Sequence, residues 1–379
     1  MARISIQTIA ELKNQTFSKL ENVYNFQYGQ FNINPDNGGA YPIYGANGII
    51  GGYTEFNAEK SVIIGHMGEN AGSVLWEEGK HFVTYNGTIA KPKNENELNA
   101  KFGYYWLVNL NIRKICAGSG QPFLSYNDLN ELPITFPPLP EQKKIASVLS
   151  ALDDKIALNK KMNQKLERMA KRLYDYWFVQ YDFPDKNGHP YKTTGGKMVW
   201  NEVLKREIPE GWEVKTIGDY LKIGNGRDHS KLADGPYPVY GSGGLMRYVA
   251  EYLHDGETVL FPRKGTLNNV MYRNEPLWTV DTMFYTSVLV PHSALFVFYS
   301  AKMFEFERLN TGTGVPSMTS DIIKKLPIIS PDRQTLEQFD KTVAKLYNQI
   351  HHNEKEISRL TKLRDKLLPL LMNGQVVVD

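Results

Sequence analysis

Cysteine is almost absent from this chain, because Cys116 is the only one among its 379 residues. A single thiol cannot close an internal disulfide, so the fold cannot depend on such cross-links. The opening residues MARISIQTIA also lack the apolar core of a secretory signal. These two absences predict a cytoplasmic protein that is stabilised by its buried core.

The chain has no hydrophobic run long enough to cross a membrane. Its most apolar window, SVLVPHSALFVFYSA from Ser287, is interrupted by Pro291 and His292. We expect a buried strand there, followed by a buried helix. A membrane is therefore not among the expected partners.

A strong charge of one sign is missing as well. The chain carries 44 Lys and Arg against 41 Asp and Glu, a formal net charge of +3. This balance neither requires nor excludes a nucleic-acid partner. Whether the chain binds nucleic acid has to be judged from where its charges lie.

An internal repeat is the main feature that the sequence does contain. The phrase YPIYGANG begins at Tyr41 and YPVYGSGG at Tyr237, 196 residues later. LPITFPP and LPIISP follow at an offset of 194, as do GSGQPFLSYNDL and GTGVPSMTSDI, and two Glu-Gln pairs lie 196 apart. Two unrelated loops rich in Gly, Tyr and Pro are the alternative. Four echoes in the same order instead favour two copies of a whole domain.

Each copy combines short apolar runs with a few helical patches. SVIIG, AGSVLW, ETVLF and SVLVP are bounded by turn residues and predict strands, whereas KFGYYWLVNLNIRKI from Lys101 predicts a helix. Each copy therefore resembles an α+β globule of about 130 residues, an ordinary size for a domain.

Two segments differ from these globules because Gly and Pro are absent or rare in them and apolar residues recur every three or four positions. The first lies between Pro140 and Pro184, and the second covers residues 335–372. Each predicts a helix of about 38 residues with one apolar seam. The seam residues are Ile145, Leu149, Leu152, Ile156, Leu166, Leu173 and Trp177 in the first helix, and Leu336, Phe339, Val343, Leu346, Ile350, Ile357, Leu360, Leu367 and Leu371 in the second.

The two helices are each other's simplest partners. A lone helix of this kind would expose its seam to water, and the globule between them makes antiparallel pairing the natural arrangement. Asn159 or Asn163 in one seam can pair with Asn353 in the other and determine the register, although solvated polar positions are the alternative. The predicted fold class is α+β, with two α/β globules separated by two long antiparallel coiled-coil helices in a pseudo-twofold internal repeat.

The stretch PPLPEQKKIASVLSALDDKI, which opens the first helix, carries the most specific signature. Together with the YGSGG-like phrase and the terminal LRDKLLPLLMNGQV, it resembles the specificity subunit of type I restriction-modification systems. The resemblance covers nearly the whole chain. It implies a first target recognition domain over residues 1–138, a spacer helix over 139–180, a linker and second target recognition domain over 181–332, and a second spacer helix with the C-terminal tail over 333–379.

The resemblance also implies a function and partners. The chain would be a non-catalytic subunit that reads a bipartite site in double-stranded DNA, with one half-site per domain. Its helical spacer would hold two methyltransferase (M) subunits, and restriction (R) subunits would join the full complex. We expect no cofactor on this chain, whereas S-adenosylmethionine, ATP and Mg are expected on the partner subunits.

Basic residues are concentrated on the two helices. Residues 140–178 carry nine Lys and Arg against five Asp and Glu, and residues 333–372 carry eight against five. These charges can contact DNA phosphates or an acidic partner, and a solvated helix face is the alternative.

The glycine-rich phrase shared by both copies offers four candidate DNA contacts, which are Tyr44, Asn47, Tyr240 and Ser242. Glycine lets a backbone approach DNA closely, and Ser and Asn can bond bases or phosphates. A structural turn that both domains need is the alternative. A phrase shared by two domains with different targets cannot specify either target, although it can still hold the DNA backbone.

Residues that differ between the copies are better candidates for reading bases. Arg suits guanine and Asn suits adenine, because each can make two hydrogen bonds to that base. The candidates in the first copy are His66 and Asn70, beside Glu69 in IIGHMGENAG; those in the second are Arg227, His229 and Lys231, followed by Arg263, Lys264, Asn268 and Asn269. Solvated surface side chains are the alternative for each residue taken singly.

The sequence contains no complete motif of an enzyme that modifies or cuts DNA. FPPLP lacks the Asn or Asp that a methyltransferase needs before its prolines, and Asp128, Glu141 and Lys143 only formally match a nuclease pattern. GSGQP and TGTGVP lack the Lys-Ser/Thr of a phosphate-binding loop, and the eight histidines show no metal-ligand spacing. A protein-binding scaffold with a coiled-coil spacer is the main alternative function, and a self-contained DNA methyltransferase or nuclease is the other.

Overall fold

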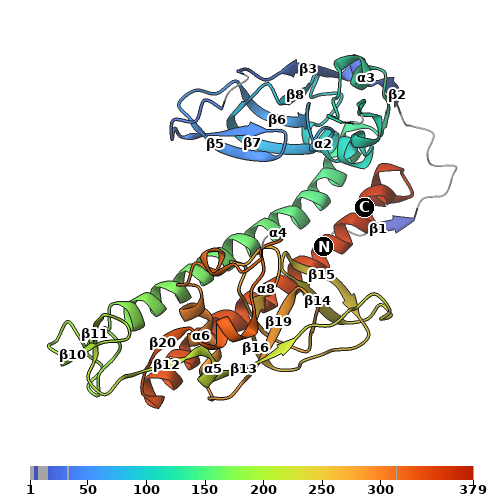
Figure 1. The fold of residues 1–379 in the computed structure, drawn as a ribbon. Helices are drawn as coiled ribbons and strands as arrows, with labels where there is room; N and C mark the ends of the chain where they lie inside the picture. The colour runs from blue at the N-terminus through green and yellow to red at the C-terminus, as the bar shows by residue number, and fades with distance from the viewer. Residues whose placement is uncertain (1–3, 7–15, 32–33, 119, 313, 379) are drawn as a thin grey trace. The chain divides into compact units, whose positions relative to one another are not determined.

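The computed structural model describes residues 4–6, 16–31, 34–118, 120–312 and 314–378 (Figure 1). Packing divides the chain into two compact units. Unit 1 comprises Met1–Lys160 and Lys355–Asp379, and unit 2 comprises Lys161–Glu354. Each unit thus holds one globule and one half of each long helix. Most of the opening segment without an apolar signal core lies outside the described residues.

Two helices far longer than the others define the architecture. Helix α4 covers Leu139–Tyr174 and continues into the π-helical turn η3, Asp175–Val179, while α8 covers Arg333–Met372. Every predicted seam position is buried or half-buried, so the predicted periodicity is confirmed. Among the described residues, no helix is long and apolar enough to cross a bilayer.

Polar pairs within the seam show that α8 runs antiparallel to α4. In unit 1, Asn159 Nδ2 donates to Glu356 Oε2 at 2.7 Å. In unit 2, Asn353 Nδ2 donates to Asn163 Oδ1 at 2.7 Å, which confirms the predicted asparagine pair. Gln349 Nε2 donates in turn to Asn353 Oδ1 at 2.8 Å. Buried amides satisfied in this way specify one register, because a shifted register would leave them without partners.

The globule of unit 1 is built on one six-stranded sheet with the order β3-β8-β6-β7-β4-β5. Its strands are β3 Tyr24–Tyr28, β4 Tyr41–Gly45, β5 Gly48–Tyr53, β6 Ala58–Gly65, β7 Val74–Val83 and β8 Gly87–Pro92. The further elements are α1 Leu20–Val23, α2 Ala100–Asn109, η2 Ile112–Ile115, α3 Tyr126–Asn130 and the strand pairs β2 Thr16–Lys19 with β9 Pro133–Phe136 and β1 Ile4–Ile6 with β21 Val376–Val378. The first and last strands among the described residues therefore pair within this unit.

Unit 2 repeats this plan with a divided sheet. Its orders are β13-β19-β16-β17 and β15-β14-β18, because Pro276 interrupts the segment that corresponds to the single strand β7 and cannot donate to a ladder. The strands are β13 Leu221–Asn225, β14 Tyr237–Gly241, β15 Gly244–Val249, β16 Glu257–Pro262, β17 Met271–Asn274, β18 Trp278–Thr279 and β19 Met283–Val288. The further elements are β10 Met198–Asn201, β11 Arg206–Pro209, β12 Glu213–Thr216, α5 Ile217–Tyr220, α6 Ala294–Ala301, η4 Phe306–Leu309, α7 Ser320–Lys324 and β20 Pro327–Ser330.

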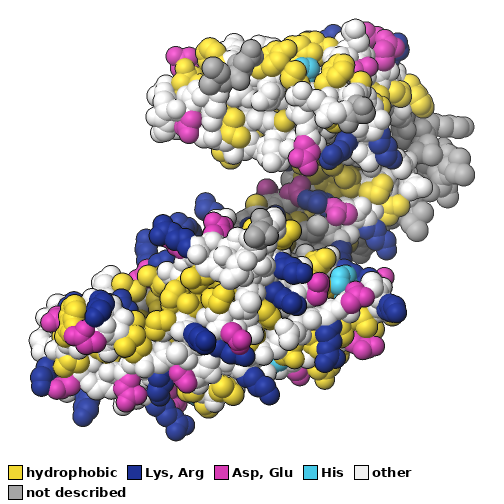
Figure 2. All heavy atoms as spheres, viewed as in Figure 1, with side chains coloured by type: hydrophobic (Ala, Val, Ile, Leu, Met, Phe, Trp, Pro, Cys, Tyr) yellow, Lys and Arg dark blue, Asp and Glu magenta, His cyan; other side chains and the backbone are white. Residues whose placement is uncertain are grey.

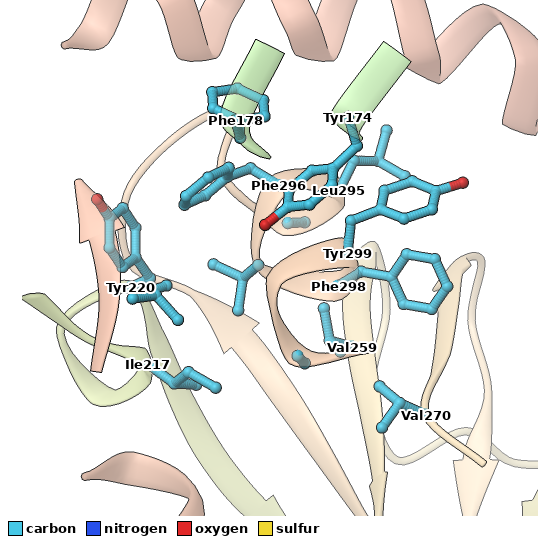
Figure 3. Packing of buried hydrophobic residues seen from close by; sticks show 14 of the residues in the cluster. Tyr174, Phe178, Ile217, Tyr220, Val259, Val270, Leu295, Phe296, Phe298 and Tyr299 are labelled. Carbon is cyan, nitrogen blue, oxygen red and sulfur yellow. The ribbon is translucent and has the colours of Figure 1, made fainter. Parts of the chain in front are cut away.

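Each globule shares its core with the helix halves of its own unit. In unit 2, Tyr174 and Phe178 at the end of the first long helix pack with Phe296 of α6, at ring-centroid distances of 6.2 and 4.8 Å (Figure 3). In unit 1, Leu149 of α4 and Leu371 of α8 belong to the cluster that holds the globule core. The fold class predicted from the sequence, two α/β globules with two long antiparallel helices in an internal repeat, is the one observed.

The buried asparagine pair makes a first prediction. Asn353→Ala leaves the buried Asn163 Oδ1 without its donor, so we expect the free energy of unfolding to fall by about 1 to 3 kcal/mol. The double variant Asn163→Ala/Asn353→Ala should lose less than the sum of the two single variants. Urea unfolding followed by circular dichroism measures these changes. Asn348→Ala, at an exposed position of the same helix, is the matched control, and strictly additive losses would contradict the pairing.

Candidate nucleic-acid interface

Three loops lie together in each unit and form what we call its loop edge. We name them the glycine turn, the central loop and the proline loop, in chain order. They comprise residues 45–48, 65–73 and 117–124 in unit 1, and residues 241–244, 263–270 and 311–318 in unit 2. Ser119 and Thr313, within the two proline loops, lie outside the described residues.

Hydrogen bonds join these loops in unit 2. Asn269 Nδ2 in the central loop donates to the Ser242 carbonyl of the glycine turn at 2.8 Å. The Gly265 N–H donates to the Pro316 carbonyl of the proline loop at 2.9 Å. The central loop is therefore held on both sides by the other two loops.

Unit 1 repeats the same arrangement with other side chains. Ser73 Oγ in the central loop donates to the Ala46 carbonyl of the glycine turn at 2.5 Å. The Gly68 N–H donates to the Pro122 carbonyl of the proline loop at 2.9 Å. Each globule thus builds the same kind of loop scaffold, although the loop sequences differ.

Glycine is required at one position of each glycine turn. Gly48 and Gly244 have φ values of +110° and +115°, a region that residues with a Cβ rarely adopt. The echoing phrase found in the sequence therefore encodes the same tight turn twice.

The loop edge of unit 2 is basic. The segment after β13 lies beside the central loop, because the N–H groups of Arg227 and Arg263 donate to the carbonyls of Thr279 and Thr282, each at 2.8 Å. The Arg263 guanidinium lies 5.9 Å from the centre of the Phe284 ring. Figure 2 shows that Lys and Arg lie densely over the visible face of unit 2, with acidic side chains among them. Cations beside exposed amides suit both phosphates and guanine edges.

The loop edge of unit 1 is aromatic instead. Tyr28 stacks on Tyr126 with ring centroids 3.8 Å apart, and its ring centre lies 4.4 Å from that of His66. Phe123 of the proline loop is exposed. The central loop of this unit contains Glu69 and neither Lys nor Arg. The two edges therefore offer different chemistry on the same scaffold.

The predicted contact residues fall into three groups by exposure. Exposed side chains belong to Asn47, Arg227, Lys231, Lys264 and Asn268. Half-buried side chains belong to Asn70, His229, Ser242, Arg263 and Asn269. Buried side chains belong to Tyr44, His66 and Tyr240.

The two tyrosines of the shared phrase are core residues. Tyr44 is 7% exposed and its hydroxyl donates to Glu77 Oε2 at 2.6 Å, while Tyr240 is 4% exposed and its hydroxyl accepts from Arg273 Nε at 2.8 Å. Burial raises the pKa of Tyr240 to about 12, so this phenol stays neutral at physiological pH. This burial corrects the expectation that either side chain contacts DNA, and favours the structural-turn alternative for both.

The expectation that His66 contacts DNA is also corrected. Its side chain is buried, and Nδ1 lies 2.6 Å from the Leu124 carbonyl of the proline loop. A ring held in this way supports the loop and exposes little surface to a duplex. Asn269 has a comparable role, because its amide already holds the glycine turn.

One basic residue near the loops escaped the sequence prediction. Arg113 of η2 is exposed, and its backbone lies against Gly72, where a Cβ built on that glycine would meet the Arg113 Cα at 2.6 Å. The signal in the sequence was the Arg-Lys pair of NIRKI, just before the GSGQP echo. It adds a cation to an edge that otherwise carries few.

The residues that formally matched a nuclease have structural roles. Asp128 accepts from Ser125 in the capping box at the start of α3, and Glu141 lies in the first turn of α4, where the helix dipole favours a carboxylate. Among the described residues, no group of three or more His, Cys, Asp or Glu could hold a metal ion.

Comparison with known proteins gives one consistent result. A family model described as the type I restriction modification DNA specificity domain matches the chain twice, over residues 13–168 and 209–362. The MjaIX specificity subunit of Methanocaldococcus jannaschii is 28% identical over 294 residues, which cover 71% of this chain and 66% of that protein, just under two thirds of its length. The HindI specificity subunit of Haemophilus influenzae is 23% identical, over 67% of this chain and 71% of that protein.

A solved structure shares the fold. The crystal structure of the S subunit of a type I restriction-modification system from M. genitalium matches with a TM-score of 0.67 and 20% identity, over 94% of this chain and 96% of that one.

Proposed function

The chain belongs to the family of type I restriction-modification DNA specificity subunits, and from this premise we propose that unit 1 reads one half of a split DNA target and unit 2 reads the other half. The observation that carries this proposal is the loop scaffold, which recurs in both units with different side chains at its edge. One scaffold with two chemistries suits two different half-sites. The proposal includes a cytoplasmic location.

The side chains of unit 2 support contacts to phosphates and guanine. Lys231 and Lys264 are exposed point charges, whereas Arg263 is half-buried against an aromatic ring. A guanidinium with restricted motion loses less entropy when it forms paired bonds to a base. We therefore assign base contact to Arg263 and Asn268, and phosphate contact to the lysines.

We propose further that this chain catalyses no reaction itself. The carboxylates that formally matched a nuclease cap or begin helices, as described above. Methyl transfer and cleavage would then belong to M and R subunits. S-adenosylmethionine, ATP and Mg would bind to those partners.

Random-sequence duplexes test the proposal directly. The full chain, assembled with its methyltransferase partner, should select two short blocks separated by a constant gap. The purified chain alone should transfer no methyl group and cut no DNA. Selection of no sequence, together with capture of proteins only, would favour the scaffold alternative.

Arg263→Ala and Asn268→Ala should relax one half-site only. Each lost pair of bonds to a base costs about 1 to 3 kcal/mol of discrimination. Selection from a randomised duplex library measures the effect at each position, with Asn348→Ala as the control. If the variants weakened binding to all sequences equally, these residues would be phosphate contacts.

We also propose that the helices determine the gap between half-sites. A helix of about 38 residues spans about 57 Å at 1.5 Å per residue, or roughly 17 base pairs of B-DNA as an upper limit. The Asn159–Glu356 and Asn163–Asn353 bonds identify residues 355–361 as the heptad facing residues 155–161. Matched heptads can therefore be removed without disturbing the seam.

Deletion of residues 155–161 together with 355–361 should shorten the selected gap by about three base pairs, because about 10 Å of helix is lost. Selected gap length is the measurement, since a changed rotation between the domains can also lower affinity. Deleting either heptad alone is the control and should disturb the seam. An unchanged gap after the matched deletion would show that the helices do not set the spacing.

A row of exposed side chains along the first long helix supports a docking face for a methyltransferase subunit. These residues follow a 3,4 spacing beside the buried seam within unit 2, and they are Met162, Lys165, Met169, Arg172 and Tyr176. Apolar and basic side chains on one face suit an amphipathic helix that carries acidic residues.

Met169→Glu should therefore reduce co-purification of the chain with its methyltransferase partner, by about tenfold in affinity, which corresponds to about 1.4 kcal/mol. The change places a charge within the apolar row. Val203→Glu, at an exposed apolar position between β10 and β11, is the matched control. Equal co-purification of both variants with the unaltered chain would contradict this docking face.

A further inference from the structure

Each unit exposes a pair of aliphatic side chains directly after its glycine turn. The exposed fractions are 63% for Ile49 and 41% for Ile50 in unit 1, and 51% for Leu245 and 56% for Met246 in unit 2. The pairs are the second and third residues of strands β5 and β15 and lie 196 residues apart. Exposed aliphatic residues at equivalent positions of both units suggest a function that the two units share.

A β-bulge re-aims one member of each pair. In unit 1, Tyr44 lies opposite Ile49 and Ile43 opposite Gly51, so Ile50 is the additional residue. The register of the other hairpin shifts at the same point, and Met246 is the additional residue there. A bulge places two residues of one strand against one residue of its partner and turns a side chain out of the regular alternation.

A glycine ends the strand beside each bulge, and in unit 2 it makes room for the re-aimed side chain. A Cβ built on Gly241 would meet Met246 Sδ at 2.7 Å, whereas one built on Gly45 would lie in ordinary contact with Ile50 Cδ1 at 3.5 Å. The tight turn and the bulge therefore hold both aliphatic pairs in the same way.

The pairs lie beside the candidate interface. Each glycine turn is bonded to its central loop, through Ser73 and Ala46 in unit 1 and through Asn269 and Ser242 in unit 2. Aliphatic side chains cannot bond phosphates. They are, however, the residue types that proteins insert between base pairs, where they unstack and kink the duplex.

We propose that each aliphatic pair is a wedge that enters a base step in or beside the half-site of its own unit. This inference rests on the proposed function and deepens it, because it assigns a sequence-independent distortion to a feature common to both units. Two side chains are far too few for a protein interface, which buries about 800 Å² per partner. They are enough for one base step.

The test uses the full chain with its methyltransferase partner and the duplex that the assembly selects. 2-Aminopurine, whose fluorescence rises when it is unstacked, is placed at each step of both half-sites in turn. The unaltered assembly should show one bright step for each half-site. Ile49→Ser/Ile50→Ser should abolish only the first, Leu245→Ser/Met246→Ser only the second, and each should lower affinity by roughly tenfold.

Controls separate the possible failures. Val203→Ser removes an exposed aliphatic residue elsewhere and should change nothing, while Leu245→Ile/Met246→Leu should keep the bright step. If the unaltered assembly selects no split target, the proposed function fails before any wedge is tested. If the target is selected but the serine variants leave fluorescence and affinity unchanged, the wedge is overturned and the function stands.

Two further outcomes would also overturn the wedge. Loss of the methyltransferase partner from the serine variants in the absence of DNA would assign the pairs to a protein interface. An equal loss of affinity when deoxyuridine replaces thymidine would assign them to direct contact with thymine methyl groups.

Discussion

Burial of one apolar seam between two long helices is the constraint on which the rest of the structure depends. Neither helix can keep its seam in water, and each globule packs its own core onto the half-seams of its unit, through Leu149 in unit 1 and Phe339 in unit 2. The helices are therefore part of both cores. A change in the register of the seam would disturb both globules as well as the helices, which is why satisfied amides at the centre of the seam matter.

Equivalent positions of the two units carry different residues that make different hydrogen bonds. In unit 1, the Tyr105 hydroxyl donates to Asp153, which also accepts from Arg364 at 2.8 Å. At an offset of 194 residues, unit 2 places the hydroxyls of Tyr299 and Tyr347 2.9 Å apart. The position that corresponds to the arginine is the buried Ala170. The repeat thus keeps a hydrogen-bonded tyrosine at this position while its partners change.

The candidate interface follows the same logic of a shared frame with different side chains. Turn, bulge and loop contacts recur because both globules need them to hold three loops together. The surface of those loops is free to differ, and it is basic in unit 2 and aromatic in unit 1. Sequence specificity would then depend on the loop side chains that differ between the units. A distortion common to both half-sites would depend on the aliphatic pairs, which both units share.

The sequence by itself determined the features that depend on local spacing. The alternating 4,3 pattern predicted both long helices and their seam, since seam residues recur along one face of a helix regardless of tertiary context. Ordered echoes at offsets of 194 and 196 predicted the duplication, and the asparagine pair followed from antiparallel geometry. The resemblance to specificity subunits rested on three local phrases, which open the first helix, form the glycine turn and end the second helix.

Only the tertiary structure decided which polar side chains of the loops remain accessible. Tyr44 and Tyr240 looked like contacts because their phrase is rich in glycine, and His66 because its loop differs between the copies, yet all three are buried. Arg113 approaches the central loop, and the aliphatic pairs are re-aimed, through contacts that no local pattern encodes. Burial and loop assembly arise from pairing between distant segments, whereas a single sequence displays only the preferences of neighbouring residues.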